Sequence, residues 1–276
     1  MPIPYYHVDA FTGELFAGNP AGVCILSAPL ADSIMQKIAA ENRHSETAFV
    51  VPRADGDFDL RWFTPKIEDD LCGHATLASA YVLALRKHNR WPVRFHTRSG
   101  MLTVAQVKNS QNLAIQNNDS FEMDFPAMPP QPCETPVGLL PALGLKAALV
   151  MKSRDYLVVV DQAEQVQALS PDMAALAKLN AGMGTIVTAP GEGDVDYVCR
   201  MFLPSAGIDE DPATGSIHCT LAPYWAGRLD KDRLGEGTFR AQQLSARGGS
   251  VQCTIVGDRV RIAGRTRLYL HGTLEI

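Results

Sequence analysis

The sequence lacks several patterns that mark large classes of protein. No stretch of it approaches about 18 uninterrupted apolar residues, the length that a membrane-spanning helix needs. The segment from Met1 to Asp9 has no basic start followed by an apolar run, so it does not have the form of a signal peptide. The net charge of −5 comes from both signs mixed along the chain, without the clustered basic face of a nucleic-acid-binding protein. These absences predict a cytoplasmic protein that binds neither membranes nor nucleic acids.

Metal and cofactor motifs are missing as well. The six cysteines lack the Cys-x-x-Cys spacing of structural zinc sites, and without a secretory signal we expect reduced thiols. Two close pairs, Cys72 with His74 and His218 with Cys219, do not form such a pattern. The chain has no His-Glu-x-x-His motif, no Gly-x-Gly-x-x-Gly after a strand and no P-loop. The sequence therefore predicts no metal ion and no organic cofactor.

What the chain does have is an internal repeat. Its 276 residues suit one large domain or two of ordinary size, and its hydrophobic fraction of 46% is normal for a globular protein. The pattern Arg-x-Phe-x-Pro occurs at 61–65 and again at 200–204, an offset of 200−61 = 139 residues. A segment around Arg98 is echoed around Arg247, an offset of 247−98 = 149. Two related halves tend to have a cleft between them, which the ends of the repeated motifs would line.

Hydrophobic periodicity predicts several strands and a buried helix in each half. In the first half, Asp32 is expected to cap a helix that ends near Asn42. The Ala- and Leu-rich run from Gly73 to Leu85 is expected to form a helix buried on most faces. In the second half, helices are expected at 174–179 and from Gly215 onward. Strands are expected at 5–11, 23–26, 45–51, 58–63, 93–96, 102–107, 113–115, 156–160, 197–202 and from 239 to the C-terminus.

The fold class that follows is α+β, with two similar pseudo-repeat domains, each a mostly antiparallel or mixed sheet wrapped around a central helix. Prolines crowd the segment 118–136, which is expected to hold no regular structure and to form the crossover between the domains. The first domain is expected to comprise residues 1–120 joined by the C-terminal strand at about 264–276, and the second residues 121–263.

The two central helices are expected to begin at glycines, Gly73 and Gly215, which are 215−73 = 142 residues apart. Free N–H groups and the positive end of the helix dipole favour an anion at such a terminus, and glycine lets a ligand approach the backbone closely. Two helix starts that face one cleft would suit a substrate carboxylate, with Ser216 beside the second. The alternative is that these residues are ordinary helix caps.

Three side chains are candidates for proton chemistry. Glu46 precedes a strongly apolar strand, and a carboxyl group in apolar surroundings tends to have the raised pKa that a general acid/base needs. His74 can relay a proton near neutral pH. Asp211 ends an acidic run, and Pro212 holds it in an extended geometry that can orient a polar group. The alternatives are a surface glutamate, a structural histidine and a solvated acidic run.

Six collinear segments together resemble the phenazine-biosynthesis PhzF-like isomerase family, which has the diaminopimelate-epimerase fold. Any one of them would be weak evidence, but six in order are specific. They lie at 7–12, 18–21, 45–49, 61–65, 71–78 and 210–216. The resemblance implies two similar domains with the active site between them, catalysis without metal or organic cofactor, and a homodimer.

The resemblance also implies roles for individual residues. In the phenazine-pathway enzyme, a glutamate removes a proton from one ring carbon of a dihydro-hydroxyanthranilate and returns it to another. Glu46 matches that glutamate, and His74 and Asp211 match partners that contact the substrate. The positions expected to bind substrate are Ser45, Gly73, Gly215 and Ser216.

The chain departs from the epimerases of this fold, which use two cysteines. Cys72 falls where the first of them lies, whereas the second motif, 211–215, has no cysteine. A two-thiol racemase is therefore disfavoured, and Cys72 is expected to be a small buried apolar residue. The segment 217–225 is similar to the broad branch of the family rather than to the phenazine-pathway members, which leaves the substrate open.

The prediction is a cofactor-independent isomerase in which Glu46 moves a proton between carbons of a small carboxylated metabolite. The alternatives are a racemase, epimerase or lyase on the same fold, and a non-catalytic binding protein. A serine hydrolase using Ser216, His74 and Asp211 is also conceivable, but the chain has no Gly-x-Ser-x-Gly elbow.

Overall fold

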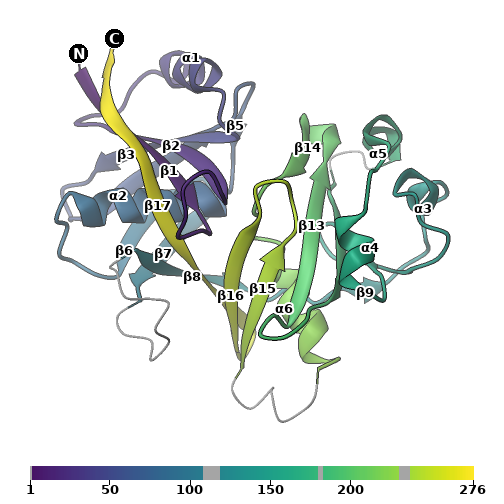
Figure 1. Cartoon of the computed structure of the whole chain (residues 1–276). Coiled ribbons are helices and arrows are strands. Elements are labelled where there is room, and N and C mark those ends of the chain that lie inside the picture. The colour runs from purple at the N-terminus through teal and green to yellow at the C-terminus, as the bar shows by residue number, and fades with distance from the viewer. Residues whose placement is uncertain (1, 108–118, 180–182, 230–236) are drawn as a thin grey trace. The chain divides into compact units, whose positions relative to one another are not determined.

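A computed structural model describes residues 2–107, 119–179, 183–229 and 237–276 (Figure 1). The chain forms two compact units, Met1–Asp124 with Ala263–Ile276, and Phe125–Ile262. Each unit combines a mixed β-sheet with a buried helix, so the expected α+β class with two similar halves is confirmed. No helix within the described ranges is both long and apolar enough to cross a membrane.

The first unit builds its sheet around β1, which pairs antiparallel with both β17 and β2. Strand β2 pairs parallel with β3, and β3 antiparallel with β4. The unit boundaries fall within β8 and β17. The strands are β1 (Pro2–Ala10), β2 (Asn19–Ile25), β3 (Glu46–Pro52), β4 (Phe58–Phe63), β5 (Glu68–Asp69), β6 (Val93–Thr97), β7 (Gly100–Gln106), β8 (Ser120–Pro126) and β17 (Arg259–Glu275), and the helices are α1 (Asp32–Asn42) and α2 (Gly73–Leu85).

Helix α2 is the buried helix of the first unit and packs against β1, β2 and β3 (Figure 1). Its small residues allow this close packing on most faces, and every side chain from His74 to Ala80 is buried. The two hydroxyls within it are satisfied locally, because Thr76 Oγ1 donates to the Cys72 carbonyl and Ser79 Oγ to the Ala75 carbonyl. The predicted first and last residues of this helix, Gly73 and Leu85, are both confirmed.

The second unit arranges β11 parallel to β12, β12 antiparallel to β13, and β13 parallel to β15. Its buried helix α6 packs on β16, and Trp225 Nε1 of α6 donates to Thr188 Oγ1 of β12. The strands are β9 (Gln131–Pro132), β10 (Leu149–Lys152), β11 (Tyr156–Val159), β12 (Thr185–Pro190), β13 (Tyr197–Leu203), β14 (Ile208–Asp211), β15 (Thr238–Gln243) and β16 (Gly249–Val256); the helices are α3 (Leu139–Ala142), α4 (Ala163–Gln167), α5 (Met173–Leu179), α6 (His218–Ala226) and the 3₁₀ helix η1 (Pro204–Ala206).

The repeated Arg-x-Phe-x-Pro motif forms the same cluster in both units. In the first unit, Arg61 donates from Nε and Nη2 to the two carboxylate oxygens of Glu68, both at 2.7 Å, and lies over the Phe63 ring. In the second, Arg200 donates to Glu210 at 2.7 and 2.8 Å and lies over the ring of the matching phenylalanine, Phe202. The repeat is therefore structural: a bidentate ion pair ties each motif strand to the short strand that follows it.

Strand register extends this correspondence to the ends of the motifs. Trp62 pairs with Asp69 across β4 and β5, and Met201 pairs with Asp211 across β13 and β14. Asp69 and Asp211 are 211−69 = 142 residues apart, the same offset as that between the two glycines Gly73 and Gly215. The same offset matches Cys72 to residue 214, a threonine.

Several expected elements differ from those observed. Asp32 is the first residue of α1 rather than its cap, and its carboxylate accepts from Arg61 Nη1 at 2.7 Å instead. Helix α6 starts at His218, not at Gly215, because the His218 N–H bonds the Gly215 carbonyl in a short turn of i to i+3 bonds. Gly18, with φ of 66°, makes the bend directly before β2, which begins at the next residue.

The proline-rich segment 118–136 does contain regular structure, contrary to expectation. Pro126 is the last residue of β8 and Pro132 the last of β9, positions where a strand tolerates the missing N–H. Strand β12 and helices α3 and α4 were not anticipated. The strand expected at 113–115 lies outside the described residues.

Candidate active site

Glu46 and His74 meet inside the first unit. Glu46 opens β3, where pleating places its side chain on the opposite face from Phe49, which packs with α1 residues. His74 is the second residue of α2, which lies against β3. Only 6% of Glu46 and 5% of His74 are exposed. The sequence offered both as candidates, and the fold brings them together in a nearly dry environment.

Both nitrogens of the His74 ring have polar neighbours. Nε2 lies 3.2 Å from Oε2 of Glu46, and Nδ1 lies 3.4 Å from Sγ of Cys72. Cys72 is buried, as expected, but it is more than an apolar filler because its thiol contacts the ring. The imidazole thus has both a carboxylate and a thiol as polar neighbours, and the sulfur also lies 4.0 Å from Nε2.

Burial and, to a smaller extent, the like charge of His44 together lower the pKa of His74 to about 3. The imidazole is therefore neutral at pH 7 and carries one N–H. With that hydrogen on Nε2, the ring donates toward the Glu46 carboxylate while Nδ1 accepts from the Cys72 thiol.

A second layer of ring side chains surrounds His44. Its Nε2 lies 2.9 Å from the Tyr5 hydroxyl, and the His7 ring centroid lies 4.3 Å from its own. His7 in turn lies 3.7 Å from the buried carboxylate of Asp9. Ser45, a predicted substrate-binding residue, is half-buried between His44 and Glu46. Sequence reasoning missed this histidine cluster, although its members lie within or beside two of the matching segments.

The candidates of the second half lie together in the second unit. Asp211 ends β14, where the Thr214 hydroxyl hydrogen-bonds to its Oδ2. Gln243 holds the same loop, because its Nε2 donates to the Asp211 carbonyl at 2.6 Å and its Oε1 accepts from the Thr214 N–H at 2.8 Å. These bonds fix the orientation of the Asp211 carboxylate. Gln243 was not foreseen, since only strand pairing brings it to this loop.

Gly215 and Ser216 lie in the turn that leads into α6. Ser216 Oγ is 3.5 Å from Nη2 of Arg154, a half-exposed cation that sequence analysis did not single out. A hydroxyl beside a guanidinium is a suitable environment for an anionic group. The hydrolase alternative finds no support here, because both nitrogens of His74 face Glu46 and Cys72 rather than a serine.

Two groups within the described residues have the donor spacing of a metal site. One is Glu46, Cys72 and His74, all buried. The other is Asp55, Asp57 and His96, in which Asp55 is exposed. In the second group, Arg94 already donates to both oxygens of Asp57 at 3.1 Å. The Arg94 guanidinium therefore already neutralises that carboxylate.

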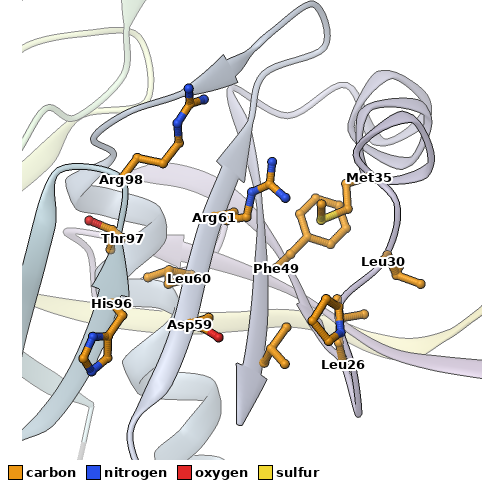
Figure 2. Close-up of a pocket in the computed structure, with 12 residues that line it drawn as sticks. Leu26, Leu30, Met35, Phe49, Asp59, Leu60, Arg61, His96, Thr97 and Arg98 are labelled. Atoms are coloured by element: carbon orange, nitrogen blue, oxygen red, sulfur yellow. The ribbon is translucent and has the colours of Figure 1, made fainter. Parts of the chain in front are cut away.

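A separate cavity of about 320 Å³ opens on the other face of β3 (Figure 2). Leu26, Met35 and Phe49 form its apolar wall, and Arg61 and Arg98 stand at one side. Both arginines contact the carboxylate of Glu68, which lowers their attraction for a further anion. Glu46 and His74 do not line this cavity, so it is distinct from the candidate active site.

Comparison with known proteins agrees with the fold and the motifs. The model of the phenazine biosynthesis-like protein family matches residues 8–272. An uncharacterized isomerase of Pseudomonas aeruginosa is 50% identical over 277 residues, covering 100% of both chains. The structure of a PhzF-family protein from Enterococcus faecalis superposes with a TM-score of 0.90 at 40% identity, covering 100% of both chains.

A hydroxyproline epimerase from Agrobacterium vitis shares the fold alone, with a TM-score of 0.61 at 12% identity over 99% of this chain and 92% of that one. Together with two further curated relatives named as isomerases, these matches confirm the expected enzyme class, an isomerase. The chain belongs to the phenazine biosynthesis-like protein family.

Proposed function

We propose that this isomerase moves a proton between carbons of a small carboxylated substrate, with Glu46 as its single general acid/base and without a cofactor. The observation that carries the proposal is the buried contact of 3.2 Å between Glu46 and His74. A carboxylate in a site that excludes water can remove a proton from carbon and hold it long enough to return it elsewhere.

His74 has two tasks in this scheme. Its Nε2–H orients the Glu46 carboxylate in the resting enzyme, and it can turn to donate to a substrate oxygen as charge develops during proton removal. The neutral ring suits both tasks, because a hydrogen-bond donor without a full charge does not neutralise the base. Cys72 contacts the ring through Nδ1.

The start of α2 is proposed to bind the substrate carboxylate. This helix has 13 residues, and its N-cap, Cys72, makes no side-chain capping bond to the first turn. The N–H groups at Gly73 and beyond are proposed to receive the anion, which the helix dipole also favours. Asp211, Gly215 and Ser216 remain proposed substrate contacts, and the predicted homodimer is testable by sedimentation.

Solvent isotope exchange tests the proposal. The protein is incubated in heavy water with a panel of small unsaturated carboxylic acids, including a dihydro-hydroxyanthranilate, and deuterium on carbon is followed by NMR and mass spectrometry. We expect incorporation by the wild type and by Glu41→Gln, a control at an exposed position of α1. Glu46→Gln should lower it by a factor of about 10² to 10⁴. Exchange that persists at the wild-type rate in Glu46→Gln would show that another group is the base.

A two-thiol racemase is the main rival on this fold, and Cys72 beside His74 is the observation that favours it. Its second thiol is missing, since the matching position in the second unit is Thr214. The rival predicts that Cys72→Ser loses all exchange and that the wild type racemises a chiral α-carbon. Exchange that survives in Cys72→Ser, with Glu46→Gln inactive, rejects it.

A further inference from the structure

Glu46, Cys72 and His74 offer three different donor atoms to one point. The carboxylate oxygen, the sulfur and the ring nitrogen all lie within 4.8 Å of one another, and all three residues are buried. They come from two elements, the start of β3 and the start of α2, whose packing holds them together. A small movement of rigidly held side chains is therefore enough to bring all three donors onto one ion.

The spacing fits a tetrahedral first-row metal. Zinc lies about 2.0 Å from nitrogen and oxygen ligands and about 2.3 Å from sulfur, so adjacent ligand atoms stand roughly 3.3 to 3.5 Å apart. Here Nε2 is 3.2 Å from Oε2 of Glu46 and 4.0 Å from Sγ of Cys72. One edge already has the required length, and the second needs a shift of about half an ångström. The third, from Sγ of Cys72 to the Glu46 carboxylate, is within 4.8 Å and must also shorten.

We propose that Glu46, Cys72 and His74 form a binding site for Zn²⁺, and that the bound ion blocks proton transfer. On binding, the Cys72 thiol loses its proton to solvent, and the ring hydrogen of His74 moves from Nε2 to Nδ1. The sulfur, Nε2 of His74 and one carboxylate oxygen then supply three ligand positions. The fourth position remains open to water. The inhibitory part rests on the proposed function, because the ion occupies the lone pair with which Glu46 would accept a proton from carbon.

The donor chemistry favours zinc over magnesium or calcium, since thiolate and imidazole suit borderline-soft ions and hard ions prefer oxygen. The group Asp55, Asp57 and His96 provides an internal contrast. It has no sulfur, and Arg94 already neutralises Asp57. We therefore place the zinc site at the buried group.

Cobalt binding provides a test that does not depend on activity. Co²⁺ reports a thiolate ligand through a charge-transfer band in the near ultraviolet. Titration of the reduced full-length protein should show this band at one Co²⁺ per chain, and Zn²⁺ should displace it. Cys72→Ser should lose the band, and Glu46→Gln and His74→Asn should each weaken cobalt binding tenfold or more.

Three variants serve as controls. Cys133→Ser removes a half-buried thiol and Cys219→Ser the thiol beside His218, and both should keep the band. Asp57→Asn, which disables the second group, should keep it too. Circular dichroism checks that each variant is folded; if Cys72→Ser is not, the affinities of Glu46→Gln and His74→Asn decide. The proposed site is wrong if the wild type shows no band or if the band survives in Cys72→Ser. It is also wrong if Glu46→Gln and His74→Asn bind Co²⁺ as tightly as the wild type.

Isotope exchange then separates the site from the function. If the proposal holds, Zn²⁺ inhibits exchange over the same concentration range in which Zn²⁺ displaces Co²⁺. Adding a chelator then restores exchange. Zinc binding without inhibition would overturn the inhibitory part. Cobalt binding at the site in a protein that exchanges no substrate would leave the metal site standing and count against the proposed function.

Discussion

Glu46 Oε2 and His74 Nε2 lie 3.2 Å apart, one at the first residue of β3 and the other in the first turn of α2. Parallel pairing of Ala21 in β2 with Glu46 positions the strand, and burial of α2 against the same strands positions the helix. The contact is thus a product of the core of the first unit. The same ring reaches Cys72 through its other nitrogen, which makes the three residues one chemical group.

Exchange activity should depend on the position of the Glu46 carboxylate as well as on its charge. Glu46→Asp keeps the charge but withdraws the carboxylate by one methylene, and we expect a partial loss of exchange activity. Glu46→Gln should lose a factor of about 10² to 10⁴, the usual contribution of a positioned acid/base. Initial rates of deuterium incorporation measure both. Equal activity of the two variants would contradict a proton-transfer role.

Cys72 should act only through His74. We expect His74→Asn to lower exchange about 100-fold and Cys72→Ala about 10-fold, within the range for removing a group that orients a functional ligand. The double variant should be no slower than His74→Asn, because without the ring Cys72 has nothing to hold. Multiplicative losses in this cycle would mean that Cys72 acts on the substrate independently.

Two buried neutral histidines should make the protein sensitive to acid. Burial lowers the pKa of His74 and of His218 to about 3 in each case, against the ordinary value of 6.5. Below pH 6.5 the two imidazoles become protonated in the unfolded chain, whereas in the folded chain they stay neutral down to about pH 3. The free energy of unfolding should therefore decrease as the pH is lowered from 6.5 to 3, by up to about 1.4 kcal/mol per pH unit for each histidine.

The variant His218→Gln isolates one of these contributions. His218 accepts or donates at Nδ1 with the Tyr197 hydroxyl at 2.8 Å, a partner that a glutamine can keep. Urea unfolding at a series of pH values should show a shallower slope between pH 6 and 4 in the variant, by about 1.4 kcal/mol per pH unit. Identical slopes in variant and wild type would mean that His218 takes up its proton in the folded state.

The two copies of the Arg–Glu pair should differ in energy. The Arg200 side chain is 11% exposed and also donates to the Leu169 carbonyl at 2.7 Å, whereas the Arg61 side chain is 31% exposed. Glu210→Gln leaves a nearly buried guanidinium short of a counter-charge, which should cost about 3 kcal/mol. Glu68→Gln should cost about 1 kcal/mol, because the more exposed Arg61 keeps Asp32 as a second counter-charge at 2.7 Å. Denaturant unfolding compares the two, and similar costs would show that burial does not set the difference.

Local sequence was sufficient for the elements that carry their own boundary signals. Helix α2 begins at Gly73 and ends at Leu85 as predicted, because an uninterrupted run of small and apolar residues satisfies helix propensity and burial at once. Helix α6 was misplaced by three residues, since Gly215 to Ile217 close i to i+3 bonds that composition alone does not distinguish from helical ones. The strand β12 was missed although Gly184 precedes it and Pro190-Gly191 marks its end, both of which are turn signals.

The sequence by itself determined the α+β class, the duplicated Arg-x-Phe-x-Pro unit, the family, and Glu46 and His74 as candidates, because each depends on residue types and their spacing along the chain. Only the tertiary structure decided that these two side chains touch, that Cys72 completes the group, and that Gln243 holds the Asp211 loop. Such contacts join residues brought together by strand pairing and core packing, and a distance of a few ångströms across a core leaves no periodic trace in the sequence.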